Sequence, residues 1–346
     1  MEIKKKDIRA LTKDQLRDFF VKNGDKAFRG NQVYEWLWQK SAHSFEDMTN
    51  ISLETRQMLQ DNFVINHIKV DQMQRSADGT IKNAVRLHDD LIVESVLIPT
   101  ASRTTACVSS QVGCSLDCKF CATARLKRMR NLNPDEIYDQ VVAIDNESRL
   151  YHNRPLSNIV FMGMGEPLLA YKSVMKSIHY ITSEDGLHMS PRRITVSTAG
   201  IAKMIKKMAD DASKVNLAIS LHAADDIKRN EIMPINEQNN LEVLMDSLKY
   251  YYQVTKNRIS YEYIAFQNFN DGIDDAKNLL KLCKSFPVRI NIIEYNPIDG
   301  VEFVKADEEK IDRFAQFMRD HDVMCTIRRS RGKDIDAACG QLANKG

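Results

Sequence analysis

The chain has 346 residues, of which 43% are hydrophobic and 28% charged, a composition typical of a globular protein with a sizeable core. Its formal net charge of +2 excludes nucleic-acid binding through overall charge, so any such binding must depend on local basic patches. The basic N-terminus continues as an amphipathic pattern, and no run is long and apolar enough to span a bilayer, so we expect a cytoplasmic protein without a membrane partner. In that reducing location the seven cysteines favour metal binding or catalysis over a disulfide framework.

Three parts follow one another along the chain. Residues 1–62 are predicted to form a small helical domain, because bulky residues such as Val33 and Leu37 recur at helical spacing. Residues 63–103 contain short extended runs and predict a β segment that links this domain to the next. Residues 104–346 alternate strand-like and helical runs and predict one α/β domain.

Six strand-like runs in the last part are each followed by a polar sequence. The runs cover 104–110, 157–163, 192–198, 215–222, 259–266 and 288–297. Helical patterns separate them at 133–150, 171–182, 201–211, 240–252 and 274–286. Such strand–helix units predict a parallel sheet curled into a full or partial (βα)6 barrel. Active sites of these folds collect at the C-terminal ends of the strands, where CVSSQVGC, MGMGEP, STAG, SLH and EYNP fall.

Cys114, Cys118 and Cys121 lie in the loop after the first of these strands, with the spacing C-x3-C-x2-C. A zinc site normally takes four ligands in two separated pairs, and no second Cys/His pair lies nearby in the sequence. Three thiolates on one tight loop suit a [4Fe–4S] cluster that keeps one iron open. We therefore expect an iron–sulfur cluster here, while a zinc site with a distant fourth ligand and chance clustering remain alternatives.

This spacing, with Phe120 directly before the last cysteine, resembles the radical S-adenosylmethionine (SAM) superfamily. The resemblance implies a partial barrel, a [4Fe–4S] cluster whose open iron binds SAM, and reductive cleavage of SAM to a 5′-deoxyadenosyl radical. It also implies SAM contacts at the ends of the later strands. The candidates are Gly165, Glu166, Ser197, Ser220, Leu221, His222 and Asn296. Glu166 suits the amino group of SAM, with a plain Gly/Pro turn as the alternative, and the others singly are typical of ordinary polar loops, so their shared position at strand ends carries the prediction.

The other four cysteines have different surroundings. Cys283 and Cys325 lie in apolar sequence and are predicted to be core thiols. Cys107 lies within a strand, where a core role is the plain alternative. Cys339 lies among small residues beside Gly340, a context that favours an exposed thiol. Cys339 is therefore the candidate reactive thiol outside the cysteine loop.

Over nearly its whole length the chain resembles the RlmN family, the bacterial radical SAM enzymes that methylate C2 of adenosine in RNA. The matching segments, in order, are FRGNQVYEWLW, VESVLIP, CVSSQVGCSLDCKFC, MGMGEP, SLHA, PIN and RRSRGKDIDAACGQLA. The resemblance implies methylation of adenosine in 23S ribosomal RNA and in transfer RNA, with two SAM molecules per turnover. We also expect an external electron donor and a monomeric enzyme.

The same resemblance assigns roles to three residues. One SAM methylates the thiolate of Cys339, and the deoxyadenosyl radical from the second removes a hydrogen atom from that methyl group. The resulting methylene radical adds to C2 of adenine and links RNA to protein covalently. Glu94, in LIVESVLIP, then removes the C2 proton, although an outward-facing strand glutamate is the alternative. Cys107 attacks the sulfur of Cys339, which releases the methylated RNA and leaves a disulfide that needs external reduction.

Two basic segments flank the predicted site. One spans 125–130 directly after the cysteine loop, the other spans 328–333 just before Cys339, and each carries four cations. Such runs are usually solvated surfaces, but their position favours binding of RNA phosphates. Two rival functions remain: methylation of C8 of adenosine by the same cysteines, and a non-catalytic RNA-binding protein with a structural iron–sulfur cluster.

Overall fold

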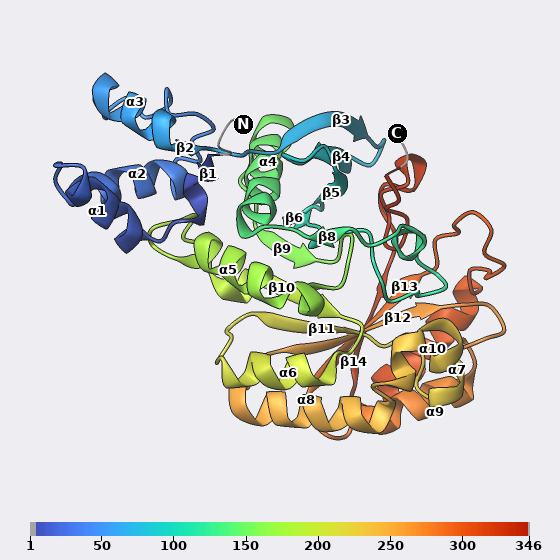
Figure 1. Ribbon diagram of the computed structural model, residues 1–346. Helices are drawn as coiled ribbons and strands as arrows, with labels where there is room; N and C mark the ends of the chain where they lie inside the picture. The colour runs from blue at the N-terminus through green and yellow to red at the C-terminus, as the bar shows by residue number, and fades with distance from the viewer. Residues whose placement is uncertain (1–4, 345–346) are drawn as a thin grey trace.

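The computed structural model describes residues 5–344. Within this range ten strands form one sheet in the order β14-β13-β12-β11-β10-β9-β6-β5-β4-β3, with helices against its outer face (Figure 1). In this sheet β6 and β9 to β14 pair with their neighbours in parallel. The other pairs, β3 with β4, β4 with β5 and β5 with β6, are antiparallel. The edge strands β3 and β14 do not pair with each other in the part of the chain that the structure describes, so the barrel is partial.

The parallel strands and the helices between them make up the barrel. The strands are β6 (Thr104–Cys107), β9 (Asn158–Phe161), β10 (Ile194–Thr198), β11 (Asn216–Ser220), β12 (Ile259–Ala265), β13 (Val288–Glu294) and β14 (Met324–Arg328). The helices are α4 (Pro134–His152), α5 (Tyr171–Thr182), α6 (Ala202–Asp210), α7 (Asp226–Ile232), α8 (Leu241–Thr255), α9 (Ile273–Leu282) and α10 (Glu308–Asp320). A short ribbon of β7 (Gln111–Val112) and β8 (Arg130–Asn131) encloses the cysteine loop between its two strands.

Alternate residues of each parallel strand face the helices and the inside of the barrel. On β12, Ile259, Tyr261 and Tyr263 are buried in the main hydrophobic core, while Ser260 and Glu262 line a cavity inside the barrel. The other parallel strands follow the same alternation. The outer face of the sheet is therefore packed against helices, and its inner face lines a cavity with both polar and apolar side chains.

Helix α10 and strand β14 extend the predicted six strand–helix units by one. The helix buries Ile311, Phe314 and Met318 against the sheet. The strand is an edge strand in which Cys325 alternates with exposed neighbours, and Cys325 is buried as predicted. This strand pairs on one side only and is largely exposed. Its apolar pattern is therefore too short to predict a strand from the sequence.

The antiparallel strands of the predicted linker continue the barrel sheet. They are β3 (Lys69–Arg75), β4 (Ile81–Arg86) and β5 (Ile92–Pro99). Because β5 pairs along β6, the segment is built into the same sheet as the barrel strands and does not form a separate layer. The domain boundaries at residues 62 and 103 remain a prediction.

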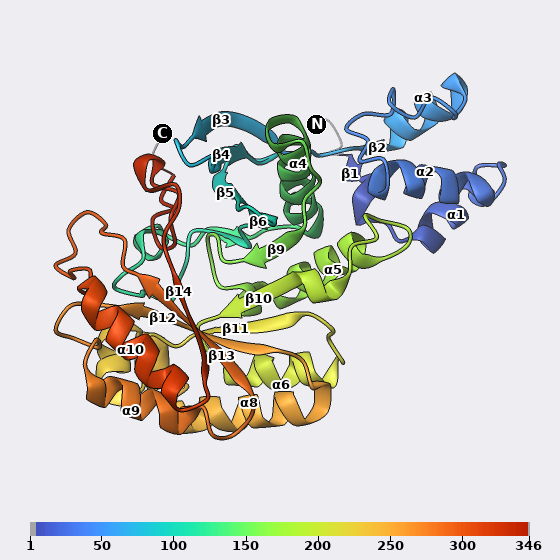
Figure 2. The ribbon, with the colours of Figure 1, turned by 180° about the vertical axis from the view of Figure 1, so that it is seen from behind.

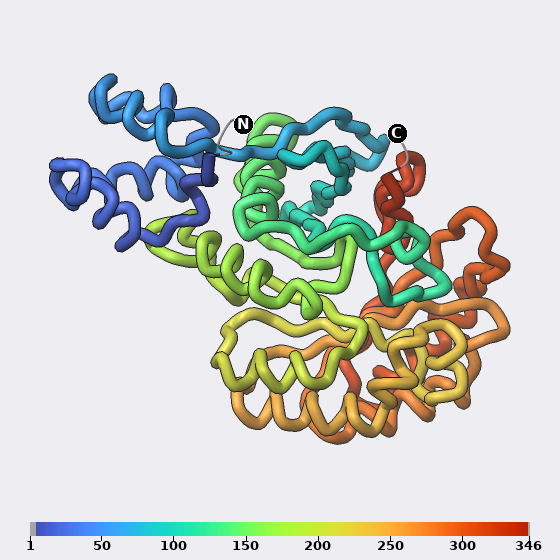
Figure 3. The backbone as a smooth tube through the Cα atoms, viewed as in Figure 1, coloured from blue at the N-terminus to red at the C-terminus, as the bar shows by residue number. Residues whose placement is uncertain are grey.

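The N-terminal helices lie beside α4 and α5 (Figure 3). They are α1 (Lys13–Lys22), α2 (Phe28–Trp38) and α3 (Leu53–Asn62), tied together by the two-residue strands β1 (Lys6–Asp7) and β2 (Phe63–Val64). The indole ring of Trp38 is fully buried, stacks on Tyr180 of α5 at 3.6 Å and meets Tyr138 of α4 edge-on at 5.1 Å. This aromatic contact fixes the N-terminal helices to the barrel.

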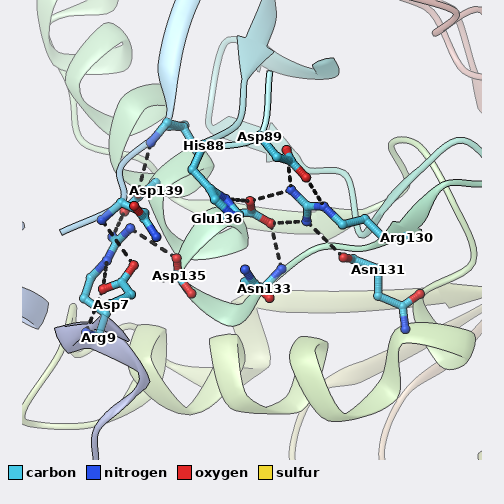
Figure 4. Close-up of polar contacts among 12 residues, drawn as sticks. Asp7, Arg9, His88, Asp89, Arg130, Asn131, Asn133, Asp135, Glu136 and Asp139 are labelled. Atoms are coloured by element: carbon cyan, nitrogen blue, oxygen red, sulfur yellow. Dashed lines mark hydrogen bonds and ion pairs between the residues drawn. The ribbon is translucent and has the colours of Figure 1, made fainter. Parts of the chain in front are cut away.

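A buried ion-pair network supports the same junction (Figure 4). The guanidinium of Arg9 pairs with Asp139 at 2.7 Å and with Asp135 at 3.2 Å, both on α4, and Asp7 lies 3.9 Å away. Three carboxylates therefore share one cation. Burial raises the pKa of Asp135 to about 7, with Asp7 and Asp139 adding to the rise and Arg9 opposing it.

We expect the free energy of unfolding to fall as pH rises toward 7 and to level off above it. Asp135 keeps its proton in the folded state over a pH range in which the unfolded chain has lost it, so stability falls by up to about 1.4 kcal/mol per pH unit between the unfolded pKa of about 3.9 and the folded pKa of about 7. Asp135→Asn should flatten this slope in urea unfolding between pH 5.5 and 8.5. Asp246→Asn, on an exposed site of α8, should leave the slope as it is; an unchanged slope in Asp135→Asn would contradict the assignment.

After β14 the chain crosses the open side of the barrel toward the β3–β4 turn (Figure 2). The amide of Gly332 donates to Asp78 Oδ2 at 3.0 Å, and Asp334 accepts from Ser76 Oγ at 2.6 Å and from the Ala77 amide at 3.1 Å. The two edges of the partial barrel are therefore bridged by this segment, residues 329–344, which we call the C-terminal segment.

Candidate active site

The cysteine loop lies at the C-terminal ends of the barrel strands and is held there by backbone bonds. The Lys119 amide donates to the Ile232 carbonyl at 3.0 Å, and the Ala122 amide donates to the Gly340 carbonyl of the C-terminal segment at 2.8 Å. Cys114, Cys118 and Cys121 all line one cavity of about 150 Å³. The predicted trio is thus gathered on a single cavity wall.

The three thiols suit a cationic cluster. Burial raises the pKa of Cys118 well above its usual range, and the neighbouring Cys121 and Cys114 raise it further. Three thiolates so close together are stable only if a cation compensates them, which is what bound iron provides. Cys114, Cys118 and Cys121 would hold the [4Fe–4S] cluster, and the cavity beside them would take SAM.

Five of the predicted SAM contacts line the same cavity. They are Gly165, Glu166, Ser197, Ser220 and His222. The carboxylate of Glu166 is buried and accepts backbone N–H bonds from Ala199 at 2.8 Å and from Leu168 at 2.9 Å. Burial raises the pKa of Glu166 to about 7, while these bonds oppose the rise. A buried carboxylate on this wall is a suitable partner for an ammonium group.

We expect Glu166→Gln to weaken SAM binding roughly ten- to hundredfold, because a hydrogen bond to a charged group contributes about 1.5–3 kcal/mol. Isothermal titration of the cluster-loaded protein with SAM measures the change. Glu147→Gln removes a partly buried carboxylate bonded to Asn83 outside the cavity and should leave the affinity unchanged. Equal affinities for wild type and Glu166→Gln would remove Glu166 from the SAM site.

The imidazole of His222 is neutral and can donate a hydrogen bond from one ring nitrogen. Its Nδ1 accepts from the Ile264 amide at 3.1 Å, so the ring proton is assigned to Nε2. Burial, with the nearby charge of Arg229, lowers the pKa of His222 to about 3. The ring also meets Phe120 edge-on at 4.7 Å, which fixes its orientation.

Two predicted SAM contacts lie elsewhere. Leu221 is fully buried in the hydrophobic core and lines neither of the two cavities. Asn296 is also buried, and its side-chain amide donates to the Cys339 carbonyl at 3.2 Å. In this structure Asn296 therefore positions the C-terminal segment.

The loop at Gly165 depends on neighbours that the sequence did not indicate. Gly165 has φ +92°, and a Cβ there would lie 2.4 Å from Gln111 Cβ, so only glycine fits. Gln111 Oε1 accepts from the Glu166 amide at 2.9 Å, and Ser109 Oγ accepts from the Met164 amide at 2.8 Å. Ser109 and Gln111 thereby tie the cysteine-bearing end of the first barrel strand to the glycine loop.

A second, larger cavity of about 390 Å³ occupies the barrel interior. Cys339 lines both cavities and so lies at their junction, whereas Cys107 lines only the larger one. Burial raises the pKa of Cys107, and the nearby Cys339 raises it further. All seven cysteines lie within residues 5–344 and are free thiols. The predicted thiol pair thus shares one cavity, although its members lie far apart in the sequence.

Glu262, in the middle of β12, also lines both cavities and was not predicted. It is buried; Oε1 accepts from Asn291 at 2.7 Å and from Ser260 at 2.9 Å, and Arg328 lies 3.6 Å from Oε2. Oε2 has no hydrogen-bond partner within the described residues. Its alternation with apolar β12 residues is the signal that could have placed it inside the barrel.

Glu94 is buried and holds the end of the C-terminal segment. Its Oε2 accepts backbone N–H bonds from Ala343 at 2.7 Å and from Asn344 at 3.0 Å, and its Oε1 lies 3.4 Å from Lys82 Nζ. Glu94 lines neither cavity, although it is on the same strand face as Ile98, which lines the larger one. The structure therefore assigns Glu94 a positioning contact, and its proton-accepting role remains a prediction.

Glu294 holds the start of the same segment. Its carboxylate pairs with Arg329 at 2.5 Å, Lys333 at 2.9 Å and Lys305 at 3.2 Å. Burial alone would raise the pKa of Glu294, but these cations outweigh it and lower the pKa to about 2. Cys339 is thus carried by a segment fixed on both sides.

Most cations of the two predicted basic segments are occupied. Arg130 pairs with Asp89 and Glu136 (Figure 4), and Arg125 donates to the Asp299 and Gly300 carbonyls. His88, Asp89 and Glu136 group like metal ligands, but the Arg130 guanidinium already satisfies both carboxylates. The Arg125 and Arg130 side chains therefore stabilise the fold.

A partial parallel barrel with three cysteines on one loop at the strand ends, beside a carboxylate-lined cavity, defines a radical SAM enzyme. None of the helices between residues 5 and 344 has the length and apolar character needed to span a bilayer. Residues 108–283 match the Radical SAM superfamily, and residues 6–65 match the family described as Ribosomal RNA large subunit methyltransferase N-terminal domain.

Full-length relatives specify the family. The chain is 68% identical to the "Probable dual-specificity RNA methyltransferase RlmN" of Christiangramia forsetii, over 99% of this chain and 97% of that protein. It is 40% identical to the "Dual-specificity RNA methyltransferase RlmN" of Nitratiruptor sp., over 98% of each. The crystal structure of a radical SAM methyltransferase from Sphaerobacter thermophilus matches with a TM-score of 0.92 at 35% identity, over 97% of this chain and 99% of that one. The chain belongs to the RlmN family of radical SAM RNA methyltransferases, which use a [4Fe–4S] cluster and SAM.

Proposed function

We propose that this enzyme methylates C2 of adenosine in 23S ribosomal RNA and in transfer RNA, through a methylated Cys339 and a covalent protein–RNA adduct. The position of Cys339 is the observation that carries the proposal. Cys339 lines both the cavity that holds the cluster cysteines and the predicted SAM contacts and the larger cavity that Cys107 lines. A methyl carrier between SAM and RNA needs this location.

The chemistry of C2 explains why a carrier is needed. C2 of adenine is an electron-poor C–H carbon and does not attack the methyl group of SAM as a nucleophile. The bound cluster and SAM supply the methyl group and the 5′-deoxyadenosyl radical. A methyl group on Cys339 Sγ, once it has lost a hydrogen atom, can add to C2 and bond RNA to the protein.

Three residues complete the proposed sequence. Glu94 takes the C2 proton, for which the bonds from Ala343 and Asn344 to its Oε2 must open, and the radical formed by the addition gives up one electron, which the cluster would accept when bound. Cys107 then attacks the sulfur of Cys339, so the bond between that sulfur and the methylene carbon breaks as a disulfide forms, and the electron pair left on that carbon takes up a proton to complete the methyl group. An external electron donor restores both thiols, which fits a cytoplasmic location. The dual specificity in the relatives' names supports two RNA substrates.

Mass spectrometry of nucleosides tests the proposal directly. Ribosomal and transfer RNA from a host that lacks the protein should carry no 2-methyladenosine at the affected sites, and restoring the protein should restore it. An 8-methyladenosine product would replace the proposal with the C8 alternative. The reduced, reconstituted protein should also release 5′-deoxyadenosine from SAM, and its failure to do so would support the non-catalytic alternative.

A further inference from the structure

The larger cavity extends to the end of the barrel opposite the cysteine loop, where the parallel strands begin and where three of its lining arginines are exposed to solvent. Four arginines line it there: Arg103 before β6, Arg192 before β10, Arg258 before β12 and Arg289 at the start of β13. Because parallel strands begin on the same side of a sheet, these four side chains surround one mouth of the barrel.

Within the part of the chain that the structure describes, these arginines have no carboxylate partner. Among residues 5–344, no carboxylate lies within 4.0 Å of a guanidinium nitrogen of any of the four, although the chain as a whole carries nearly balanced charge. Burial lowers the pKa of Arg289, and the positive charges of Arg258, Arg328 and Arg103 lower it further. Like charges held together without counterions indicate a surface that an anionic ligand completes.

The mouth and the reactive thiols are joined by inward-facing columns. Arg103, directly before β6, alternates with Thr105 and Cys107 on that strand, and all three line the cavity. Arg258, directly before β12, alternates in the same way with Ser260 and Glu262. At a strand rise of about 3.3 Å per residue, each column spans about 13 Å from its arginine to its last residue, Cys107 or Glu262.

The mouth also faces the side of the molecule that carries the N-terminal helices. The loop 183–193 leads from α5 to β10 and ends at Arg192. Near its start, Asp185 pairs with Lys13 of α1 at 2.8 Å, and the Glu184 carbonyl accepts from Gln39 at 2.8 Å. One loop therefore connects the arginine mouth to the N-terminal helices, which lie within the match to the ribosomal RNA methyltransferase N-terminal domain.

We propose that the arginine mouth, formed by Arg103, Arg192, Arg258 and Arg289, binds RNA backbone phosphates beside the target adenosine, which enters the barrel from this end. The inference rests on the proposed function, because it takes RNA as the substrate. The phosphates stay outside on the arginines while the extruded base passes along the polar columns to Cys339. SAM and RNA thus approach the thiol from opposite ends, and neither has to leave for the other to bind.

The test compares two double variants in binding to a stem-loop RNA oligonucleotide with one unpaired adenosine in its loop. Arg258→Gln/Arg289→Gln should raise the Kd at least roughly tenfold at 150 mM salt and reduce the slope of log K against log salt by about 2. Arg149→Gln/Arg313→Gln removes two exposed arginines from the outer helices α4 and α10 and should change neither quantity. Arg258→Lys/Arg289→Lys keeps the charge and should recover most of the slope.

Thermal unfolding shows whether the variants fold, and loss of two repelling charges should not lower the midpoint. If the wild type binds and methylates RNA and the Arg258→Gln/Arg289→Gln variant binds with the same Kd and slope, the proposed role of the arginine mouth is overturned. The proposed function then still stands. A loss confined to Lys127→Gln/Arg128→Gln would move the phosphate site to the opposite end and also overturn it. A wild type that neither binds nor methylates the RNA overturns both proposals.

Discussion

Cys107→Ala is expected to accumulate a covalent protein–RNA adduct, whereas Cys339→Ala is expected to form none. The structure supports different roles for the two thiols, because Cys339 stands between the two cavities and Cys107 lines only the larger one. Without Cys107 the methylene link to RNA can form but has no thiol to release it. Without Cys339 the methyl group has no carrier. Product formation should fall roughly a thousandfold or more in either variant, because residues that act as a unit fail together.

Denaturing gel electrophoresis of labelled RNA, followed by mass spectrometry of the shifted band, measures this result. The double variant Cys107→Ala/Cys339→Ala should behave like Cys339→Ala alone. Cys283→Ala is the matched control, since that thiol donates to the Leu279 carbonyl and lines neither cavity. An adduct in both single variants, or in neither, would refute the assignment.

Glu94→Gln and Glu94→Ala should fail in different ways. A glutamine oxygen can still accept from the Ala343 or Asn344 amide, so the C-terminal segment should stay docked while the C2 proton has no acceptor. The adduct should therefore accumulate in Glu94→Gln. Alanine removes both acceptor contacts and leaves the buried Lys82 unpaired, which costs several kcal/mol in other proteins. The segment should then detach and carry Cys339 away from its position.

Hydrogen exchange of residues 337–344 separates the two outcomes. The amide exchange rates of this segment should rise roughly ten- to a hundredfold in Glu94→Ala, because its hydrogen bonds to a charged carboxylate are lost. They should change much less in Glu94→Gln. Glu262→Gln is the matched control, because Glu262 is another buried carboxylate and lines both cavities. If the adduct accumulated in Glu262→Gln and not in Glu94→Gln, the proton acceptor would be Glu262.

The cysteine loop and the glycine loop could be predicted because their chemistry is local in the sequence. Three thiols within eight residues can reach one cluster in almost any fold, and the GMGE sequence needs only a strand end to be useful. The structure places both on one cavity wall, as expected. Leu221 was placed with them by sequence adjacency alone, but its side chain faces the core, because neighbouring residues along an extended chain face opposite sides.

The C-terminal segment could not be predicted in the same way. Its contacts with Glu94, Asp78 and Glu294 join residues that are far apart in the sequence, and its own sequence has no helix or strand pattern. The basic run that contains Arg329 and Lys333 was predicted to bind RNA phosphates, but both side chains pair with Glu294. Charge is visible in a sequence, whereas the partner that neutralises it is not.

The sequence by itself determined the family and the order of six of the seven parallel strands, and it predicted which thiols would hold the cluster, because these depend on local spacing and alternation. Only the tertiary structure decided that Cys339 stands at the junction of two cavities and that Glu94 holds the segment carrying it. It also decided which arginines remain unpaired around the mouth of the barrel. Curling the sheet brings inward-facing residues of separate strands together, and no local pattern records which of them meet.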